Sequence, residues 1–89
     1  MLEQNVEIIN KLGLHARAAT KFASTANKFD SKIQVVFGDK TIDGKSIMAL
    51  MLLAAAKGSL ITLSTDGPDA EQALSSLLEL INNRFDEDE

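Results

Sequence analysis

Cysteine, tryptophan and tyrosine are absent from this chain of 89 residues, and histidine and proline occur once each. Without cysteine the chain forms no disulfide framework or zinc ribbon and has no thiol nucleophile. One histidine without cysteine is also a poor basis for a transition-metal site. The composition therefore excludes thiol chemistry, and we expect no metal and no cofactor.

Long hydrophobic runs are also missing. The longest, residues 47–56, has ten residues, whereas a membrane span needs about 20. Residues 3–5 are polar, so no secretory leader is visible. Because 45% of the residues are hydrophobic and 25% are charged, the composition is that of a folded domain. We expect a single domain over residues 1–89, with no membrane insertion and a cytoplasmic location.

The charges are divided unevenly along the chain. Residues 11–57 hold eight of the nine Lys and Arg residues against three acids, whereas residues 58–89 hold one cation and eight acids. The acidic residues 86–89 account for the net charge of −4, and we expect them to form a mobile tail. The basic half either forms ordinary solvated faces or meets acidic groups such as phosphate. Nucleic acid is disfavoured, because the net charge is negative and no Tyr or Trp is available to stack on bases.

Apolar periodicity predicts the elements of the first half. Residues 2–8 and 33–37 alternate between apolar and polar, which indicates half-buried strands. Residues 16–26 have the spacing of one helical face. Residues 38–39 (Gly-Asp) form a two-residue turn into a short strand over residues 40–43, since glycine in the first position suits a primed hairpin turn.

In the second half we expect a helix over residues 47–57, with Ser46 as its N-cap and Gly58 as its stop. This helix is apolar nearly all round, so part of it must be buried or used as an interface. Residues 60–65 form a fourth strand, and residues 70–81 form a long amphipathic helix.

Asp69 and Gln72, at the start of that last helix, resemble a capping box. The order of elements is therefore β-α-β-β-α-β-α. It predicts an α+β fold in which helices cover one face of a four-stranded sheet. The pattern predicts the antiparallel hairpin over residues 33–43 but not the rest of the strand order.

The only histidine, His15, stands at the predicted start of a helix. A lone histidine is usually structural or simply exposed. A helix start, however, has unpaired backbone N–H groups and a partial positive charge that bind anions. Arg17 adds a guanidinium group for phosphate oxygens. His15 is thus either a structural residue or a nucleophile beside an anion site.

Residues 44–51 contain two further features. The first three, Gly-Lys-Ser, look like the end of a P-loop, but the glycine required five positions before Gly44 is Asp39. Ser46 is then an N-cap, worth roughly 0.5–2 kcal/mol, and this role does not exclude regulation. Residues 47–51 include two methionines at helical spacing, and they form either buried core or an adaptable docking surface.

Three stretches together resemble one known family. They are residues 10–17 (Asn-Lys-Leu-Gly-Leu-His-Ala-Arg), residues 44–48 (Gly-Lys-Ser-Ile-Met) and residues 55–58 (Ala-Ala-Lys-Gly), and the turn at residues 66–69 matches too. Over almost its whole length the chain is similar to the histidine-containing phosphocarrier proteins (HPr) of the bacterial phosphotransferase system. The resemblance implies an HPr-like open-faced β-sandwich, a four-stranded antiparallel sheet with three helices on one face.

The resemblance also implies roles for single residues. His15 would accept a phosphoryl group on Nδ1 from enzyme I and pass it to an enzyme IIA, as a stoichiometric carrier rather than an enzyme. Arg17 and the backbone N–H groups of Ala16, Arg17 and Ala18 would bind the phosphoryl oxygens. Ser46 matches the position that an HPr kinase modifies in many members. The surface that docks both partners would contain Thr20, Ile47, Met48 and Met51.

One position departs from the family pattern. Proline usually follows the arginine, but here that residue is Ala18, which leaves the first turn less fixed and adds an N–H donor. Ala18 and the ending at residues 85–89 look closer to the nitrogen-branch members (NPr) than to the sugar-transport members. We therefore expect a monomeric phosphocarrier of the nitrogen branch. The alternatives are a sugar-transport HPr, a regulatory binding module controlled by Ser46 phosphorylation, and a small interaction domain.

Overall fold

Four strands and three α-helices follow one another in the predicted order, in a computed structural model that describes all 89 residues. The elements are β1 (Leu2–Glu7), α1 (Ala16–Ala26), β2 (Lys32–Phe37), β3 (Lys40–Asp43), α2 (Ile47–Leu53), β4 (Leu60–Asp66), α3 (Ala70–Asn82) and a 3-10 turn, η1 (Arg84–Asp86). The strands form one sheet in the order β1-β4-β2-β3, and every neighbouring pair is antiparallel. None of the helices has the length and apolar character that crossing a membrane requires.

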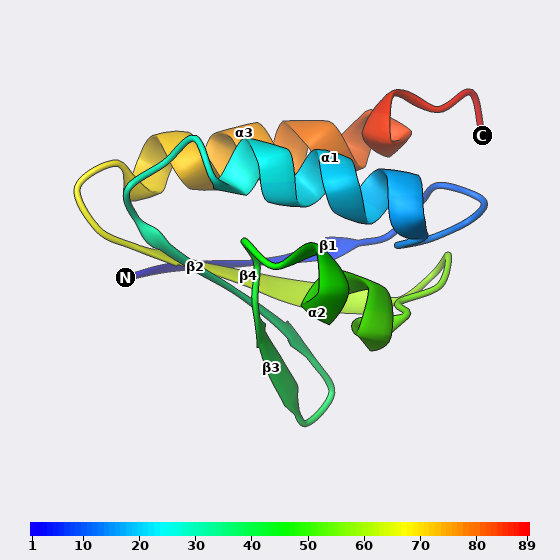
Figure 1. The fold of residues 1–89 in the computed structure, drawn as a ribbon, viewed down its shortest axis with the longest axis horizontal. Helices are drawn as coiled ribbons and strands as arrows, with labels where there is room; N and C mark the ends of the chain where they lie inside the picture. Colours follow the sequence, from blue (N-terminus) through cyan, green and yellow to red (C-terminus); the bar gives the residue numbers. More distant parts are fainter.

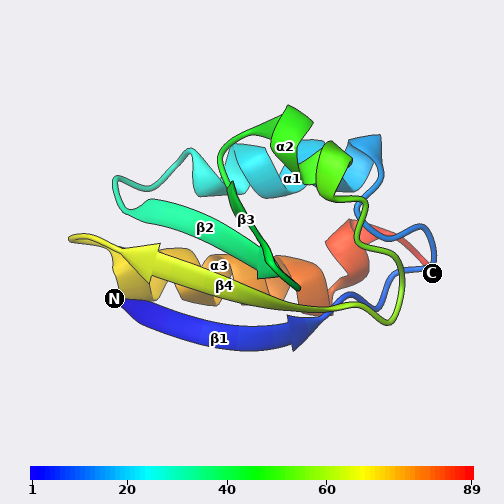
Figure 2. The same cartoon turned by 90° about the horizontal axis from the view of Figure 1, so that it is seen from below.

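The helices lie to one side of the sheet. Helices α1 and α3 run side by side across it, with α2 beside α1 (Figure 1). Figure 2 shows that the opposite face of the sheet carries no helix. This is the predicted α+β open-faced sandwich, and the structure adds the strand order that the sequence pattern left open.

The core lies between sheet and helices because the apolar positions of each element point there. Phe22 and Ala23 of α1, Ile33 and Val35 of β2, and Leu77 of α3 are all at most 1% exposed. These are the positions that the helical and alternating periods predicted. Burial of a large aliphatic or aromatic side chain stabilises the fold by about 1.5–3 kcal/mol, so each large periodic residue in the core contributes to stability.

Helix α2 is shorter than predicted. It ends at Leu53 rather than at residue 57, because Ala54 adopts a left-handed conformation with φ of 54°. Ala55 is then buried, and its carbonyl accepts a hydrogen bond from the Leu14 N–H at 2.9 Å. The apolar run continues beyond the helix because these residues pack against the loop before α1.

The two predicted helix caps have different outcomes. Ser46 caps α2 as predicted, since its Oγ accepts from the Ala49 N–H at 3.2 Å. The capping box at α3 is wrong, because the Asp69 side chain makes no cap hydrogen bond. Its carboxylate instead accepts from the backbone N–H groups of Asp30 and Ser31, each at 2.9 Å, and from the Ser31 hydroxyl. Asp69 thus ties the start of α3 to the start of β2.

These bonds should make stability depend on pH in the acidic range. The Ser31 hydroxyl, with the Asp30 N–H, holds the pKa of Asp69 below its ordinary value of 3.8. A carboxyl with a lowered folded pKa stabilises above its unfolded pKa, and this stabilisation is lost as pH falls through the folded pKa. Asp69→Asn should therefore lower the urea midpoint at about pH 7, and this effect should diminish as pH falls through the folded pKa, which lies below 3.8.

Asp39→Asn is the matched control, because Asp39 is exposed in the β2–β3 turn and forms no ion pair or side-chain hydrogen bond. It should leave the midpoint unchanged at neutral and at acidic pH. A midpoint difference for Asp69→Asn that is equal at neutral and acidic pH would contradict the assigned role of its ionised carboxylate.

Candidate functional site

The loop between β1 and α1 is fixed against the segment that follows α2. The Gly58 N–H donates to the Ile8 carbonyl at 2.7 Å, and the Leu14 N–H donates to the Ala55 carbonyl at 2.9 Å. Gly13 has φ of +64°, and a Cβ there would lie 2.5 Å from the Ala55 oxygen. Only glycine fits such a close approach in the left-handed region. These contacts set the point at which α1 begins.

His15 is the N-cap residue of α1, with extended φ and ψ of −76° and 179°. Its carbonyl accepts the first helical hydrogen bond, from the Ala19 N–H at 2.8 Å. The N–H groups of Ala16, Arg17 and Ala18 donate to no carbonyl or side chain of the protein. Of the three residues predicted to bind phosphate, Ala16 and Arg17 are exposed, so their unpaired N–H groups can bind an anion at the positive end of the helix, whereas Ala18 is fully buried.

Arg17 lies free beside this helix start. Its side chain is exposed and forms no hydrogen bond or ion pair. It lines a groove of about 590 Å³, together with Lys11, Leu12, Lys21 and residues 86–89. Its guanidinium is therefore available to an anion that binds at the N–H groups of α1.

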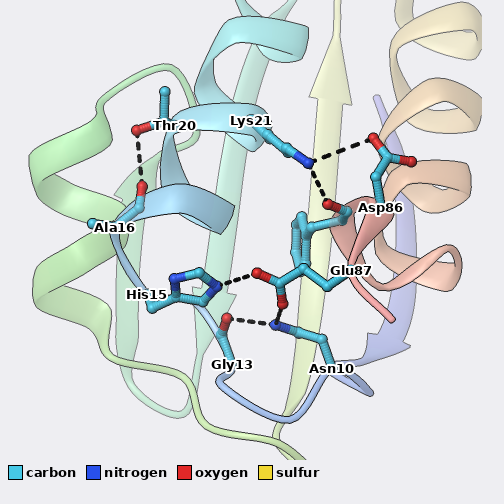
Figure 3. Close-up of polar contacts among 9 residues, drawn as sticks. Asn10, Gly13, His15, Ala16, Thr20, Lys21, Asp86 and Glu87 are labelled. Atoms are coloured by element: carbon cyan, nitrogen blue, oxygen red, sulfur yellow. Dashed lines mark hydrogen bonds and ion pairs between the residues drawn. The ribbon is translucent and has the colours of Figure 1, made fainter. Parts of the chain in front are cut away.

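The sequence did not single out two residues that the structure places at His15. The His15 Nε2 lies 2.5 Å from Oε2 of Glu87, and Oε1 of Glu87 accepts from Asn10 Nδ2 at 3.0 Å (Figure 3). Desolvation opposes ionisation of Glu87, but hydrogen bonds from Asn10 and His15, the charge of His15 when its ring is protonated, and the charge of Arg17 outweigh it. The pKa of Glu87 is held below its ordinary value as a result.

The acidic residues 86–89, expected to form a mobile tail, fold back onto the loop before α1 (Figure 2). The backbone N–H of Lys11 donates to the Glu89 carbonyl at 2.6 Å. The uneven division of charge was the one signal for this contact, because it placed a basic first half and an acidic end on the same chain.

The residues predicted to dock partners are on the surface. In α2, Ile47, Met48 and Met51 are 42%, 73% and 45% exposed, whereas Leu50 and Leu53 are buried. The core interpretation of residues 47–51 is thus right for Leu50 and wrong for the two methionines. Thr20 is also exposed, and its Oγ1 donates to the Ala16 carbonyl (Figure 3). Three exposed leucines were not predicted, Leu12, Leu52 and Leu60.

Ala18 offers a direct test of the helix start. Its N–H has no partner to lose, and the fixed φ of proline suits a first helical turn. Ala18→Pro should therefore raise the free energy of unfolding by about 0.4–1 kcal/mol, through the reduced freedom of the unfolded chain. Urea unfolding measures the change.

Ala19→Pro is the matched control one residue later. The Ala19 N–H donates to the His15 carbonyl, so proline there removes a helical bond and should cost about 3 kcal/mol. A lower midpoint for Ala18→Pro than for the unsubstituted protein would show that α1 does not begin where the structure places it.

Comparisons with known proteins agree on one family. The family model described as "PTS HPr component phosphorylation site" matches residues 2–83. The phosphocarrier protein HPr of Neisseria meningitidis is 56% identical over 89 residues, which is all of both chains. The phosphocarrier protein NPr of Shewanella violacea is 46% identical over 86 residues, covering 97% of this chain and 94% of its own.

A solved structure extends the agreement to the fold. HPr-C-His from Thermoanaerobacter tengcongensis superposes with a TM-score of 0.96 at 44% sequence identity, with all of both chains covered. The chain thus combines a histidine at a helix start, unpaired N–H groups beside it and this sheet order. The relatives that match it over nearly its whole length are phosphocarriers. The chain belongs to the HPr family of phosphocarrier proteins of the phosphotransferase system.

Proposed function

We propose that His15 receives a phosphoryl group on Nδ1 from a phosphohistidine of enzyme I and passes it to a histidine of an enzyme IIA. One observation carries this proposal: His15 caps a helix whose first three N–H groups have no partner. A phosphoryl group on the ring would lie beside these donors and beside the free guanidinium of Arg17. The protein is then a stoichiometric carrier, because the same phosphoryl group enters and leaves one side chain.

The transfer needs no metal or cofactor from this chain. The lone pair of Nδ1 attacks phosphorus, the N–P bond to the donor histidine breaks, and the electron pair returns to the donor ring. Such a transition state gains mainly from positioning and from donors that meet the charge on the phosphoryl oxygens. The exposed Ala16 and Arg17 supply these donors, and the partner supplies the in-line approach.

The exposed apolar side chains of α2 support docking beside His15. Helices α1 and α2 contact each other (Figure 1), so Ile47, Met48 and Met51 lie on the helix next to the one that His15 caps. Methionine suits a surface that meets more than one partner, because its flexible side chain adapts to different shapes. Enzyme I and an enzyme IIA are two such partners.

The nitrogen-regulatory branch is the more specific form of the proposal. It rests on Ala18 in place of proline and on the acidic ending, and a relative named NPr shares 46% identity. A relative named HPr shares 56% identity, which keeps the sugar-transport branch as the alternative. Phosphoryl transfer to purified enzyme IIA proteins of the two branches, compared at equal concentration, distinguishes them.

His15→Ala tests the central step. Incubated with phosphoenolpyruvate and enzyme I, the unsubstituted protein should take up one phosphoryl group that is labile in acid and stable in base, as a phosphoramidate is. His15→Ala should take up none. Ser46→Ala is the control and should be labelled fully. An acid-labile label on His15→Ala equal to that on the unsubstituted protein would falsify the proposal.

Regulation through Ser46 is a second role that one observation favours. Its Oγ caps α2, and the exposed Ile47 and Met48 follow directly. A phosphate there adds about −1.5 to −2 charges next to the partner contacts, while the helix N-terminus itself accepts negative charge. A HPr kinase would thus weaken docking without unfolding the domain.

Ser46→Asp should therefore lower kcat/KM for phosphorylation by enzyme I roughly 10-fold, about 1.4 kcal/mol of docking energy, with an unchanged urea midpoint. Ser46→Asn is the matched control, because asparagine caps a helix as well as aspartate but carries no charge. Equal kcat/KM values for the Asp and Asn variants would reduce Ser46 to a helix cap.

A further inference from the structure

The chain reverses direction after α3 and returns to the start of α1. Arg84, Phe85 and Asp86 have left-handed φ values of 57°, 54° and 65°, and the Phe85 side chain is fully buried. Lys21 Nζ donates to the Phe85 carbonyl at 2.7 Å. Glu87 therefore lies two residues after a side chain that is packed in the core. This packing fixes the position of Glu87, which does not depend on surface charge alone.

Both carboxylate oxygens of Glu87 have hydrogen-bond partners, Asn10 for one and His15 for the other. Its side chain is 13% exposed, against 25% for His15. The Asn10 side chain that donates to Glu87 is fully buried, and the same Nδ2 donates to the Gly13 carbonyl at 2.8 Å. The Glu87 carboxylate thus rests on a fixed amide group while its second oxygen faces the imidazole (Figure 3).

This contact selects one tautomer of the His15 ring. An ionised carboxylate only accepts hydrogen bonds, and a neutral imidazole has one N–H and one lone pair. Because Nε2 faces the carboxylate, a neutral ring that hydrogen-bonds to it carries its proton on Nε2 and its lone pair on Nδ1. Figure 3 shows the second ring nitrogen on the side away from Glu87.

We propose that Glu87 is a positioning residue for phosphoryl transfer, which holds the Nε2–H tautomer of His15 and stabilises the positive charge that the ring acquires. The inference rests on the proposed function of His15. As the Nδ1–P bond forms and the donor N–P bond breaks, Nε2 keeps its proton and the ring becomes a cation. A carboxylate on the far nitrogen of a reacting histidine orients the ring and meets this charge in other sites.

Other charged side chains line the same groove. Some form ion pairs with one another, and none contacts the His15 ring. They are Lys11, Arg17, Lys21, Asp86, Asp88 and Glu89. Glu89 pairs with Lys11 at 3.3 Å, and Asp86 lies 3.8 Å from Lys21. Glu89 is therefore a matched control in the same segment, with a carboxylate that does not touch His15.

Three variants distinguish the hydrogen bond that Glu87 accepts, its charge, and the effect of another carboxylate in the same segment. All of them retain Phe85. Glu87→Leu removes both the acceptor and the charge, Glu87→Gln keeps an oxygen that accepts from Nε2–H, and Glu89→Gln alters only the neighbouring carboxylate. The rate of phosphorylation by enzyme I, measured against carrier concentration, should show a kcat reduced roughly 10-fold or more for Glu87→Leu. KM should change little, Glu87→Gln should recover part of the rate, and Glu89→Gln should match the unsubstituted protein.

A second measurement needs no partner protein. In protein labelled with ¹⁵N at histidine, the unsubstituted chain should show an imidazole proton on Nε2 that is protected from exchange with water, and Glu87→Leu should lose it. An unchanged kcat for Glu87→Leu, an effect confined to KM, or a protected proton on Nδ1 overturns the role of Glu87. Failure of the unsubstituted protein to take up any label, with the Nε2 proton present, overturns the proposed function instead.

Discussion

The close contact between Gly13-Leu14 and Ala55 is the constraint on which the site depends. The Leu14 N–H reaches the Ala55 carbonyl only because Gly13 lacks a Cβ and adopts a positive φ. Ala54 reverses the chain after α2 to present that carbonyl. This hydrogen bond, with the one from the Gly58 N–H to the Ile8 carbonyl, couples the loop before α1 to the segment after α2. Two segments some forty positions apart therefore meet at one surface.

This coupling brings two short segments with different properties, the start of α1 and helix α2, to the same surface. The start of α1 contributes N–H groups without partners, which cost little where solvent or an anion meets them. Helix α2 contributes exposed Met48 and Met51 while Leu50 and Leu53 face the core. The seven residues of α2 thus bury one side and leave apolar side chains exposed on the other, as expected of a helix that is apolar nearly all round.

Sequence periodicity predicted the elements and most of the core, because these depend on spacing within a single strand or helix. It placed His15 at a helix start and Ser46 at a cap for the same reason. Periodicity could not predict features that depend on residues far apart in the sequence. Asp69 has the sequence context of a capping residue, yet two N–H groups and a hydroxyl from Asp30 and Ser31 satisfy its carboxylate. The contact of Glu87 with His15, 72 positions apart, has no local signature either.

The position of the acidic residues 86–89 depends more on hydrophobic packing than on charge. The ion pair between Lys11 and Glu89 is exposed, and such pairs contribute about 0–1 kcal/mol. Burial of the Phe85 ring contributes more, about 1.5–3 kcal/mol, and it fixes the chain direction just before Glu87. Charge then decides which side chains meet, since carboxylates of the tail lie near Lys11 and Lys21. Arg17 is left without an ion pair, which keeps one guanidinium free beside the unpaired N–H groups of the helix start.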